Sequence, residues 1–520
     1  MINKNILFKK TIKNFNFLKT NKDFSELISK NLPMKEKKNI LLTLNLDHDI
    51  LNIKKFINSE HLLWAKKSNN IIFFSLKSNL NIGIILGVSI DKNLDLTFSI
   101  LGTNKNINEV SDTLTCVIKY FREVIYLNNY IFDKTFSRNT ILKIQSDKIF
   151  KRKKNILTAG PSVSLLEIAS TNNASRYGWN AKSQEYIKKF EKQFAKYLGV
   201  KHAIATSSCT GALQIALLAS GVNSNDEVIV PDLTWVASAT AVRDIGAKPV
   251  FADVELDSWN IDANSVLKKI NSKTKAIIIV HLYGNPARMD KIIKIANKEN
   301  IKVIEDAAPA VGAEWKGKKC GTFGDFAAFS FQGAKLLVAG EGGMLVTNNT
   351  SLYKRAYKIS NQGRSSKKQF WIDTKGLKFK ISNIQAAFGY AQILRVHEQI
   401  AMKRRIFNWY YENLKNLECI NLHHEVKNAK SIYWMTSFMI NEKSDIKRDK
   451  VIKELKKFGI DTRPVFPSIS QYPIWHKTFL SQKNSLLISR NSINLPSGIG
   501  LTKKDVDYIS KVLIKILKRQ

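Results

Sequence analysis

The sequence predicts an α/β protein whose largest domain has a mostly parallel sheet, with a small α+β domain at each end of the chain. Two observations predict this class. Between residues 156 and 395, short apolar runs alternate with amphipathic segments, which is typical of parallel strands joined by helices. Residues 1–150 and 396–520 mix strand-like runs with helical periodicity but lack that regular alternation. A chain of 520 residues is long enough for several domains.

The first 150 residues carry a small α+β pattern of their own. Strand-like runs occupy residues 70–76, 81–90 and 94–101, where β-branched and aromatic residues concentrate. Residues 110–127 have the apolar periodicity of an amphipathic helix. The charged segment 146–155 follows, and we expect it to be a linker to the rest of the chain.

The large domain at 156–395 is expected to contain apolar strands and the helices between them. The expected strands are 202–208, 227–232, 248–254, 274–284 and 302–308. The expected helices are 181–199, 210–221, one that begins near Thr234, and 289–300. The small domain at 396–520 is expected to have a long helix through residue 416, a strand at 431–440 and a helix at 447–459.

The composition is that of a soluble globular protein, with 44% hydrophobic and 24% charged residues. A net charge of +39 would suit a nucleic-acid-binding protein, but the lysines are spread along the whole chain. No basic stretch alternates with aromatic residues as a nucleic-acid groove would require. We therefore expect no nucleic-acid partner, although the charge can help attract phosphorylated substrates.

The cysteine pattern and the N-terminus favour a cytoplasmic location. The four cysteines are far apart and predict no disulfide framework. The basic N-terminus lacks the apolar core and cleavage site of a signal peptide. No run approaches the roughly 20 apolar residues of a membrane span, so we expect no membrane partner. The sequence predicts no metal site.

One lysine stands alone among apolar residues. The segment 329–348 reads FSFQGAKLLVAGEGGMLVTN, and Lys335 has no charged neighbour for several positions on either side. A solvated lysine gains nothing from apolar neighbours, whereas desolvation lowers the pKa of an amine that must be uncharged. The glycines at 340–343 permit a close approach of the backbone. Lys335 is therefore a candidate catalytic amine.

Two segments that follow strands have both a functional and a structural interpretation. Thr210, Gly211 and Ala212 begin a helix, whose first N–H groups lack internal partners and can bind a phosphate. A tight turn with Thr210 as the N-cap explains the same residues. Trp235 follows the next strand, where it either packs in a core or offers a flat face for stacking on an aromatic cofactor.

Glu305 and Asp306 end an apolar strand, at the edge where parallel sheets bind ligands. A carboxylate there either caps a helix or pairs with a protonated ring nitrogen. Together, a phosphate cradle, an aromatic face, an acid at a strand end and an isolated lysine are what pyridoxal 5′-phosphate requires. Lys335 would form the Schiff base, and the acid would keep the pyridine nitrogen protonated so that the ring accepts electrons.

Residues 157–515 resemble the DegT/StrS-type sugar-nucleotide aminotransferases. The segments that carry the resemblance are SSCTGALQIAL, VIVPDLTWVASA, HLYGNPARMD, KFKISNIQAAFGYAQ, IDTRPVFPSISQYPIW and, above all, the block from VIEDAAPAV to GGMLVTN. The amino-acid sequences of these segments look closest to those of the perosamine-synthase branch, which aminates carbon 4 of a nucleotide-linked 4-keto-6-deoxyhexose. The resemblance implies the PLP-dependent transferase fold type I, glutamate as the amino donor, ping-pong transfer, a role in the biosynthesis of surface glycans and a homodimer.

The resemblance also implies roles for individual residues. Lys335 matches the Schiff-base lysine and proton shuttle, Asp306 the partner of the pyridine nitrogen, and Trp235 the ring-stacking aromatic. The positions that match phosphate ligands are Thr210, Gly211 and Ser330.

The sequence departs from the family pattern at two of its positions. Lys378 stands where an asparagine commonly binds the phosphate in the neighbouring subunit's site, and a lysine there still neutralises phosphate as a point charge. Pro309 replaces a Gln or His, so its side chain cannot bond to the phenolic oxygen of the cofactor.

Three further residues near these motifs have open or structural interpretations. His281 and Arg463 either serve the site or only fix the structure, and Cys209 is interpreted as a small residue beside the cradle.

Other interpretations stay open. Relatives that use the cofactor to dehydrate sugars carry a histidine in place of the lysine, which Lys335 disfavours. A regulatory protein that keeps the fold without turnover is disfavoured by the complete lysine, aspartate and tryptophan set. Residues 80–102 are loosely similar to the central hairpin of GNAT-type acetyltransferases. The N-terminal region is then either an acyltransferase acting on the new amine or a non-catalytic docking module.

Overall fold

A computed structural model describes residues 155–475, 479 and 482–518, together with the backbone of four strands between residues 62 and 100. The chain divides into two compact units. One comprises residues 1–140 and 164–166, and the other comprises residues 141–163 and 167–520.

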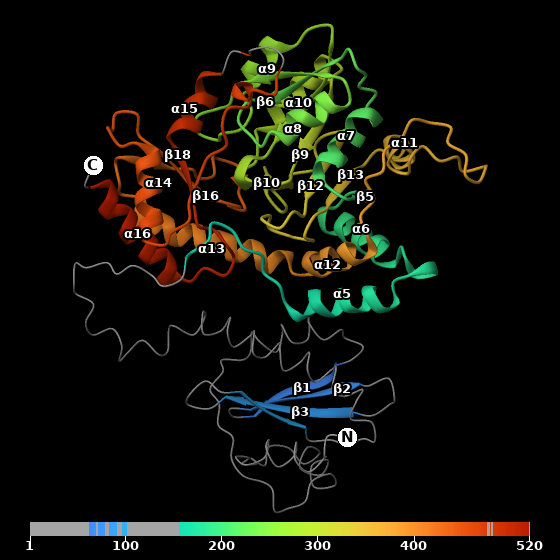
Figure 1. The fold of residues 1–520 in the computed structure, drawn as a ribbon, viewed down its shortest axis with the longest axis vertical. Coiled ribbons are helices and arrows are strands. Elements are labelled where there is room, and N and C mark those ends of the chain that lie inside the picture. Colours follow the sequence, from blue (N-terminus) through green and yellow to red (C-terminus); the bar gives the residue numbers. More distant parts are fainter. Residues whose placement is uncertain are drawn as a thin grey trace, which may run out of the picture. The chain divides into compact units, whose positions relative to one another are not determined.

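The N-terminal unit contains an antiparallel sheet in the order β1-β2-β3-β4 (Figure 1). Its strands are Leu62–Ser68, Ile71–Lys77, Gly83–Ile90 and Leu96–Ile100. The last three coincide with the strand-like runs of the sequence, so those predictions are confirmed, whereas β1 was not predicted. The predicted helix at 110–127 and most of the linker at 146–155 lie outside the described residues.

The second unit is built on a seven-stranded sheet in the order β5-β13-β12-β9-β8-β6-β7 (Figure 1). The strands are β5 (His202–Thr206), β6 (Glu227–Pro231), β7 (Lys248–Ala252), β8 (Thr274–Val280), β9 (Lys302–Asp306), β12 (Phe326–Ser330) and β13 (Gly343–Thr347). Only β13 runs against the others, because it pairs antiparallel with both of its neighbours. The predicted mostly parallel sheet is confirmed.

Helices cover both faces of this sheet. Along β6, Val228 and Val230 face one apolar cluster and Ile229 faces another, so the strand is buried on both sides. On the first face lie α7 (Cys209–Ala219), α8 (Ala237–Asp244) and α11 (Thr350–Ser360). On the second lie α6 (Glu185–Leu198), α9 (Ala263–Lys269), α10 (Met289–Lys298) and α12 (Asn383–Leu394).

The C-terminal residues form a smaller α+β layer around a second antiparallel sheet, in the order β14-β16-β18-β17. Its strands are β14 (Ile420–Leu422), β16 (Thr436–Ile440), β17 (Arg463–Pro464) and β18 (Ser492–Leu495). An apolar cluster joins the sheet to α13 (Val396–Leu414), α14 (Arg448–Lys457) and α16 (Lys503–Leu517).

Five further elements lie wholly or mostly in the second unit. The helices are α5 (Leu165–Tyr177) and α15 (Lys483–Asn491). The short strands β11 (Lys318–Lys319), β10 (Glu314–Trp315) and β15 (Ala429–Lys430) pair in that order.

The segment 431–440 differs from the prediction of a single strand. β16 begins only at Thr436, because Tyr433 has a left-handed φ of 50°. The preceding backbone turns away to another partner: the N–H groups of Ile432 and Trp434 donate to the carbonyls of Gly284 (3.1 Å) and Tyr283 (2.9 Å). The first half of the segment therefore joins the small domain to the end of the large sheet.

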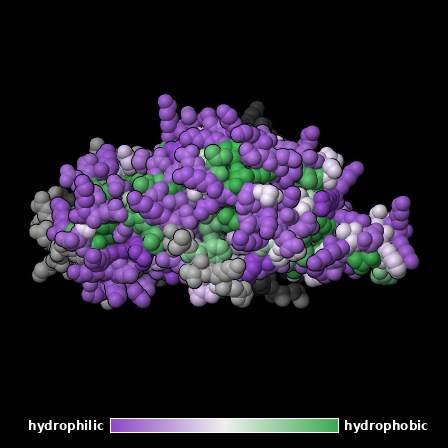
Figure 2. Space-filling view, turned by 90° about the horizontal axis from the view of Figure 1, so that it is seen from above, coloured by the Kyte–Doolittle hydropathy of each residue, from purple (hydrophilic) through white to green (hydrophobic). Residues whose placement is uncertain are grey.

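The face of the molecule drawn in Figure 2 is mainly hydrophilic. The face in Figure 2 is covered largely by hydrophilic residues with separate apolar areas between them, as the high charge content leads one to expect. None of the helices in the described part of the chain combines the length and apolar character needed to cross a bilayer.

The buried face of α7 generates a prediction about stability. Leu217 is fully buried on α7, whereas Leu267 on α9 is 53% exposed. We expect Leu217→Ala to lower the free energy of unfolding by about 2–5 kcal/mol, because it leaves a cavity in a packed core. Leu267→Ala makes the same chemical change at a helical surface and should cost less than about 1 kcal/mol. Urea denaturation measures both, and equal losses would contradict the assigned core.

Candidate active site

Lys335 lies in the connection between β12 and β13. Its backbone N–H donates to the carbonyl of Gln332 (2.8 Å), which makes a tight turn. The side chain is partly buried, and its Nζ lies 4.0 Å from the centroid of the Trp434 ring. Burial lowers the pKa of the amine, while the nearby Asp306 carboxylate acts in the opposite direction. The structure thus gives Lys335 the desolvated setting that its apolar neighbours in the sequence predict.

Asp306 ends β9 at the carboxyl edge of the sheet and is 6% exposed. Its Oδ2 accepts a hydrogen bond from Ser238 Oγ at 2.7 Å, and its Oδ1 accepts one from the N–H of Ala308 at 3.1 Å. The thiol of Cys209 lies 3.9 Å from Oδ1, and burial is the main cause that raises its pKa. The carboxylate is therefore fixed in direction and lies within electrostatic reach of Lys335.

The neighbouring Glu305 has a structural role. Side chains alternate along a strand, so Glu305 points to the opposite face from Asp306. Its oxygens accept from the N–H groups of Gly321, Phe323 and Gly324 at 2.6–2.8 Å. His281 Nε2 lies 3.0 Å from the same carboxylate, and His281 Nδ1 accepts from the N–H of Ala287. His281 and Glu305 therefore fix the backbone beneath the site.

Trp235 lies between β6 and α8, and 55% of its surface is exposed. This favours the ring-stacking interpretation over a core position, because a core tryptophan would be covered. The ring contacts that of Phe466, with centroids 5.6 Å apart. One helical turn later Ser238 reaches Asp306, so the same loop and helix position both the tryptophan and the partner of the carboxylate.

A series of aromatic rings connects Trp235 to the lysine. Phe466 stacks on Tyr283 (5.3 Å between centroids), and Tyr283 stacks on Trp434 (5.9 Å), above which Lys335 Nζ lies. Tyr283 holds a left-handed φ of 53°, a conformation that costs free energy in a non-glycine residue and is commonly found at functional sites. Residues from the large sheet and the small domain therefore form one continuous apolar wall.

The start of α7 forms a cradle of small residues. The N-cap is Ser208, not Thr210, and its Oγ accepts from the N–H of Gly211 at 3.0 Å. A Cβ atom on Gly211 would lie 2.6 Å from Cγ of Phe379, so this position needs glycine. Ser330, which is 7% exposed, ends the neighbouring strand β12. The structure thus brings the predicted residues Thr210 and Gly211 to a helix N-terminus, which suits a phosphate.

Lys378 is placed differently from the other predicted residues. Its side chain is exposed on the segment between α11 and α12, and its backbone pairs with Asn361. Burial, followed by the charges of Arg364 and Lys378, lowers the pKa of Lys380. These three cations form a basic cluster.

Arg463 is exposed and pairs with Asp461 at 3.3 Å, which indicates a role at the small domain's surface.

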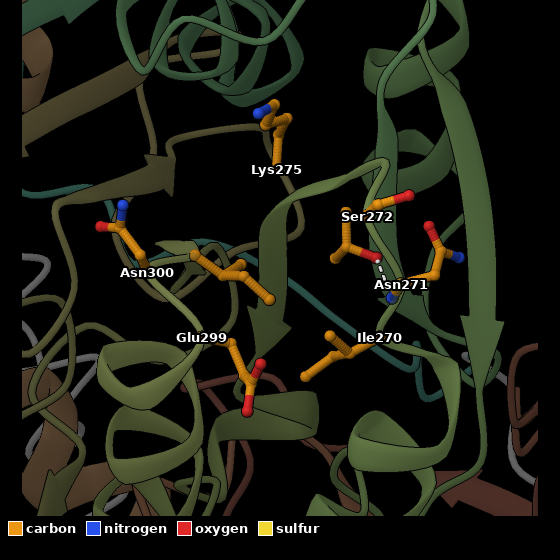
Figure 3. A pocket seen from close by; sticks show the side chains of 8 residues that line it. Ile270, Asn271, Ser272, Lys275, Glu299 and Asn300 are labelled. Carbon is orange, nitrogen blue, oxygen red and sulfur yellow. Dashed lines mark hydrogen bonds between the residues drawn. The ribbon is translucent and has the colours of Figure 1, made fainter.

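A separate surface hollow of about 470 Å³ lies at the amino ends of β8 and β9 (Figure 3). It is lined by polar and charged residues that include Asn271, Lys275 and Glu299. None of the predicted site residues lines it, and parallel sheets bind ligands at the opposite edge. The arrangement around Lys335 and Asp306 is therefore the candidate active site.

The arrangement fits pyridoxal 5′-phosphate. It provides a desolvated amine, a buried carboxylate with both oxygens oriented, an uncovered tryptophan face and a helix N-terminus that only a small residue can occupy. These are the groups that bind the aldehyde, the ring nitrogen, the ring face and the phosphate of that cofactor.

Residues 163–514 match the DegT/DnrJ/EryC1/StrS aminotransferase family. The chain belongs to this family. The members of the family that resemble the chain include the GDP-perosamine synthase of Caulobacter vibrioides, which is 40% identical over 341 residues, or 65% of this chain and 92% of the relative. The GDP-perosamine synthase of Vibrio cholerae is 36% identical over 353 residues, or 67% of this chain and 95% of the relative.

Solved structures of the aminotransferase family have the same fold. The structure of DesI in the presence of its TDP-sugar product matches with a TM-score of 0.66 at 28% identity, over 71% of this chain and 94% of that chain. The predicted fold, PLP-dependent transferase fold type I, is confirmed. The chain is a sugar aminotransferase that depends on pyridoxal 5′-phosphate, and the predicted cofactor is likewise confirmed. The N-terminal unit's sheet lies outside the match to the family.

Three residues of the site were not singled out by sequence reasoning. Ser208 could have been found, because Ser before a helix is a strong N-cap signal. Ser238 lies three residues after Trp235, which is one helical turn, but nothing local points to Asp306 as its partner. Trp434 is 99 residues beyond Lys335 in the chain, and only the fold brings them together.

The phosphate cradle generates a prediction about cofactor affinity. In Gly211→Ala the added methyl would collide with Phe379, so either the helix or the segment around Phe379 must shift. We expect the affinity of this aminotransferase for pyridoxal 5′-phosphate to fall about tenfold or more. Spectroscopic titration of the cofactor-free protein measures the affinity.

Gly160→Ala is the matched control for this change, because no atom lies within 4 Å of its new methyl. It should leave the affinity unchanged. An unchanged affinity in Gly211→Ala would show that the start of α7 is not the phosphate site.

Proposed function

We propose that this aminotransferase moves the amino group of glutamate to carbon 4 of a GDP-linked 4-keto-6-deoxyhexose, as a perosamine synthase does, for the synthesis of surface glycans. The observation that carries the proposal is the convergence of Lys335, Asp306 and Trp235 at the carboxyl edge of one sheet. The similarity to GDP-perosamine synthases over 36–40% identity supports the nucleotide and the sugar. In this proposal the enzyme acts in the cytoplasm, where nucleotide-linked sugars are made.

Asp306 would hold the ring nitrogen of the cofactor in its protonated form. Pyridoxal 5′-phosphate, when bound, supplies an aldehyde that accepts amino groups and a ring that takes up the electrons of a breaking C–H bond. The bonds from Ser238 Oγ and the N–H of Ala308 orient the Asp306 oxygens. Trp235 offers its exposed face to the ring.

Lys335 is the group that moves protons. As a free amine it takes the proton from the α-carbon of the amino donor, and in the second half-reaction it returns a proton to the sugar carbon. A base of this kind works best with a pKa near the ambient pH, and burial lowers the pKa of Lys335 in that direction. The wall formed by Trp434 and Tyr283 keeps water away from this amine.

The start of α7 would hold the phosphate of the cofactor. The N–H groups of the first turn and the positive end of the helix dipole attract it, with Thr210 and Gly211 in that turn and Ser330 on the adjacent strand.

The site is completed by a second copy of the chain, with Lys378 of one subunit meeting the phosphate held by the other. The segment that carries Lys378 also exposes Phe370 (91%), Trp371 (52%) and Ile372 (53%). Exposing three adjacent apolar side chains to water is unfavourable in free energy, so these residues favour burial against a partner. A homodimer with two shared sites is therefore part of the proposal.

The substrate class is tested with a panel of nucleotide-linked sugars. We expect the purified enzyme to convert glutamate to 2-oxoglutarate fastest with a GDP-linked 4-keto-6-deoxyhexose, with ping-pong kinetics in initial-rate plots. The dTDP- and UDP-linked forms of the same sugar serve as matched controls. Faster turnover with either of them would overturn the assigned nucleotide, and no turnover with any keto-sugar would favour a regulatory protein that keeps the fold.

The shared site is tested by mixing two inactive variants. If Lys378 acts in the partner's site, a mixed dimer of Lys335→Ala and Lys378→Ala has one intact site. Subunit exchange should then restore about a quarter of the wild-type activity, because half of the dimers are mixed and each has one working site. Assays before and after exchange measure this. A mixture as inactive as its components would place Lys378 in the same subunit's site, and full activity of Lys378→Ala alone would place it outside the site.

A further inference from the structure

Trp434 contacts the proposed catalytic lysine in two ways. It lies just before β16, is 5% exposed, and places the face of its ring 4.0 Å from Lys335 Nζ. Its indole N–H donates to the carbonyl of Ala334 at 2.8 Å. A single side chain therefore holds both the amine of Lys335 and the backbone immediately before it.

Trp434 is itself firmly fixed. Its backbone N–H donates to the carbonyl of Tyr283 at 2.9 Å, and its ring stacks on the Tyr283 ring at 5.9 Å between centroids and 23° between planes. Its carbonyl accepts from Nζ of Lys403 at 2.8 Å. Lys403 is buried on α13 and also donates to the carbonyl of Ser497. The tryptophan thus has little freedom to follow the lysine and instead determines where the lysine lies.

The ring also affects the charge of the amine. The face of an indole ring is electron-rich and attracts an ammonium group, most strongly where water is excluded. The titratable groups that face Lys335 are Asp306 from β9, whose carboxylate favours the ammonium form, and Cys209 from α7, whose thiol burial keeps neutral. Burial favours the neutral form. The Trp434 ring therefore acts with Asp306 to keep the amine able to take and release a proton.

We propose that Trp434 is a positioning residue for Lys335. The indole ring of Trp434 holds the free amine of Lys335 over its face, and the indole N–H anchors the turn that carries Lys335. The proposal rests on the catalytic role proposed for Lys335. It explains why a residue of the small domain reaches across to the loop between β12 and β13. Through Trp434 the small domain contacts the reacting amine directly. Membership of the family does not by itself imply this contact.

The test measures Lys335 in the full-length protein freed of cofactor. Its amine is reductively methylated over a range of pH, and the rate at Lys335 is followed by peptide mass spectrometry. In Trp434→Leu the surroundings stay apolar but the aromatic face is lost, so the ammonium form loses stabilisation. We expect the pKa of Lys335 to fall by about one pH unit. An unchanged pKa in the folded variant would overturn the proposal.

A second variant separates the ring from the indole N–H. Trp434→Phe keeps an aromatic face but cannot donate to the Ala334 carbonyl. We expect it to retain more than half of the ring's effect on the pKa, while amide hydrogen exchange in residues 333–338 becomes about fivefold faster. Unchanged exchange in that segment would overturn the anchoring role. This variant keeps the proposal testable even where Trp434→Leu does not fold.

Trp315→Phe is the matched control. Trp315 is also buried, its indole N–H also donates a hydrogen bond, to Asp290 at 2.8 Å, and Lys316 Nζ lies 5.9 Å from its ring. It packs in a different apolar cluster. This change should move neither the pKa of Lys335 nor the exchange of residues 333–338, and an equal shift would show a general loss of structure. Both measurements use cofactor-free protein, so they remain valid if another lysine were found to carry the cofactor.

Discussion

The proposed mechanism depends on the balance between desolvation and charge at one amine. Taking Lys335 out of water favours its neutral form, whereas the carboxylate of Asp306 favours the charged one. Burial therefore lowers the pKa of this amine below that of a solvent-exposed lysine, which favours its use as a base. Around it, Trp434 and Tyr283 help to exclude water, and Ser238 holds the carboxylate in place.

The central sheet fixes the positions of Asp306 and of the loop that carries Lys335. Asp306 ends β9, a strand with parallel neighbours on both sides, so its position is fixed by two ladders of hydrogen bonds. Glu305, one residue earlier, faces the other side and binds three backbone N–H groups, which fixes the same strand from below. The only reversed strand, β13, brings the loop of Lys335 back beside the start of α7. The arrangement of strands therefore brings the phosphate cradle, the acid and the amine together.

Local patterns in the sequence predicted those parts of the fold that depend on local physics. The apolar runs that became β5 to β9 were found because strands buried on both faces are continuously apolar. Lys335 was singled out as a candidate because its isolation from other charges is visible in the sequence. The strand β12 and the reversed β13 were not predicted, since nothing local distinguishes their direction. Trp434 was missed for the same reason: its contacts with Lys335 and Tyr283 are made by the fold alone. Thr210 was predicted to bind the phosphate, with an N-cap as the alternative; the cap is Ser208, two residues earlier, a shift that is common at helix ends.

The central claim is that the amine at position 335 binds the cofactor covalently. The most direct measurement is to reduce the purified holoenzyme with borohydride, digest it, and locate the phosphopyridoxyl group by peptide mass spectrometry. We expect one modified residue, Lys335, and no modified peptide from a Lys335→Ala protein treated in the same way. Modification at another lysine, or a cofactor that is released intact after reduction, would contradict it.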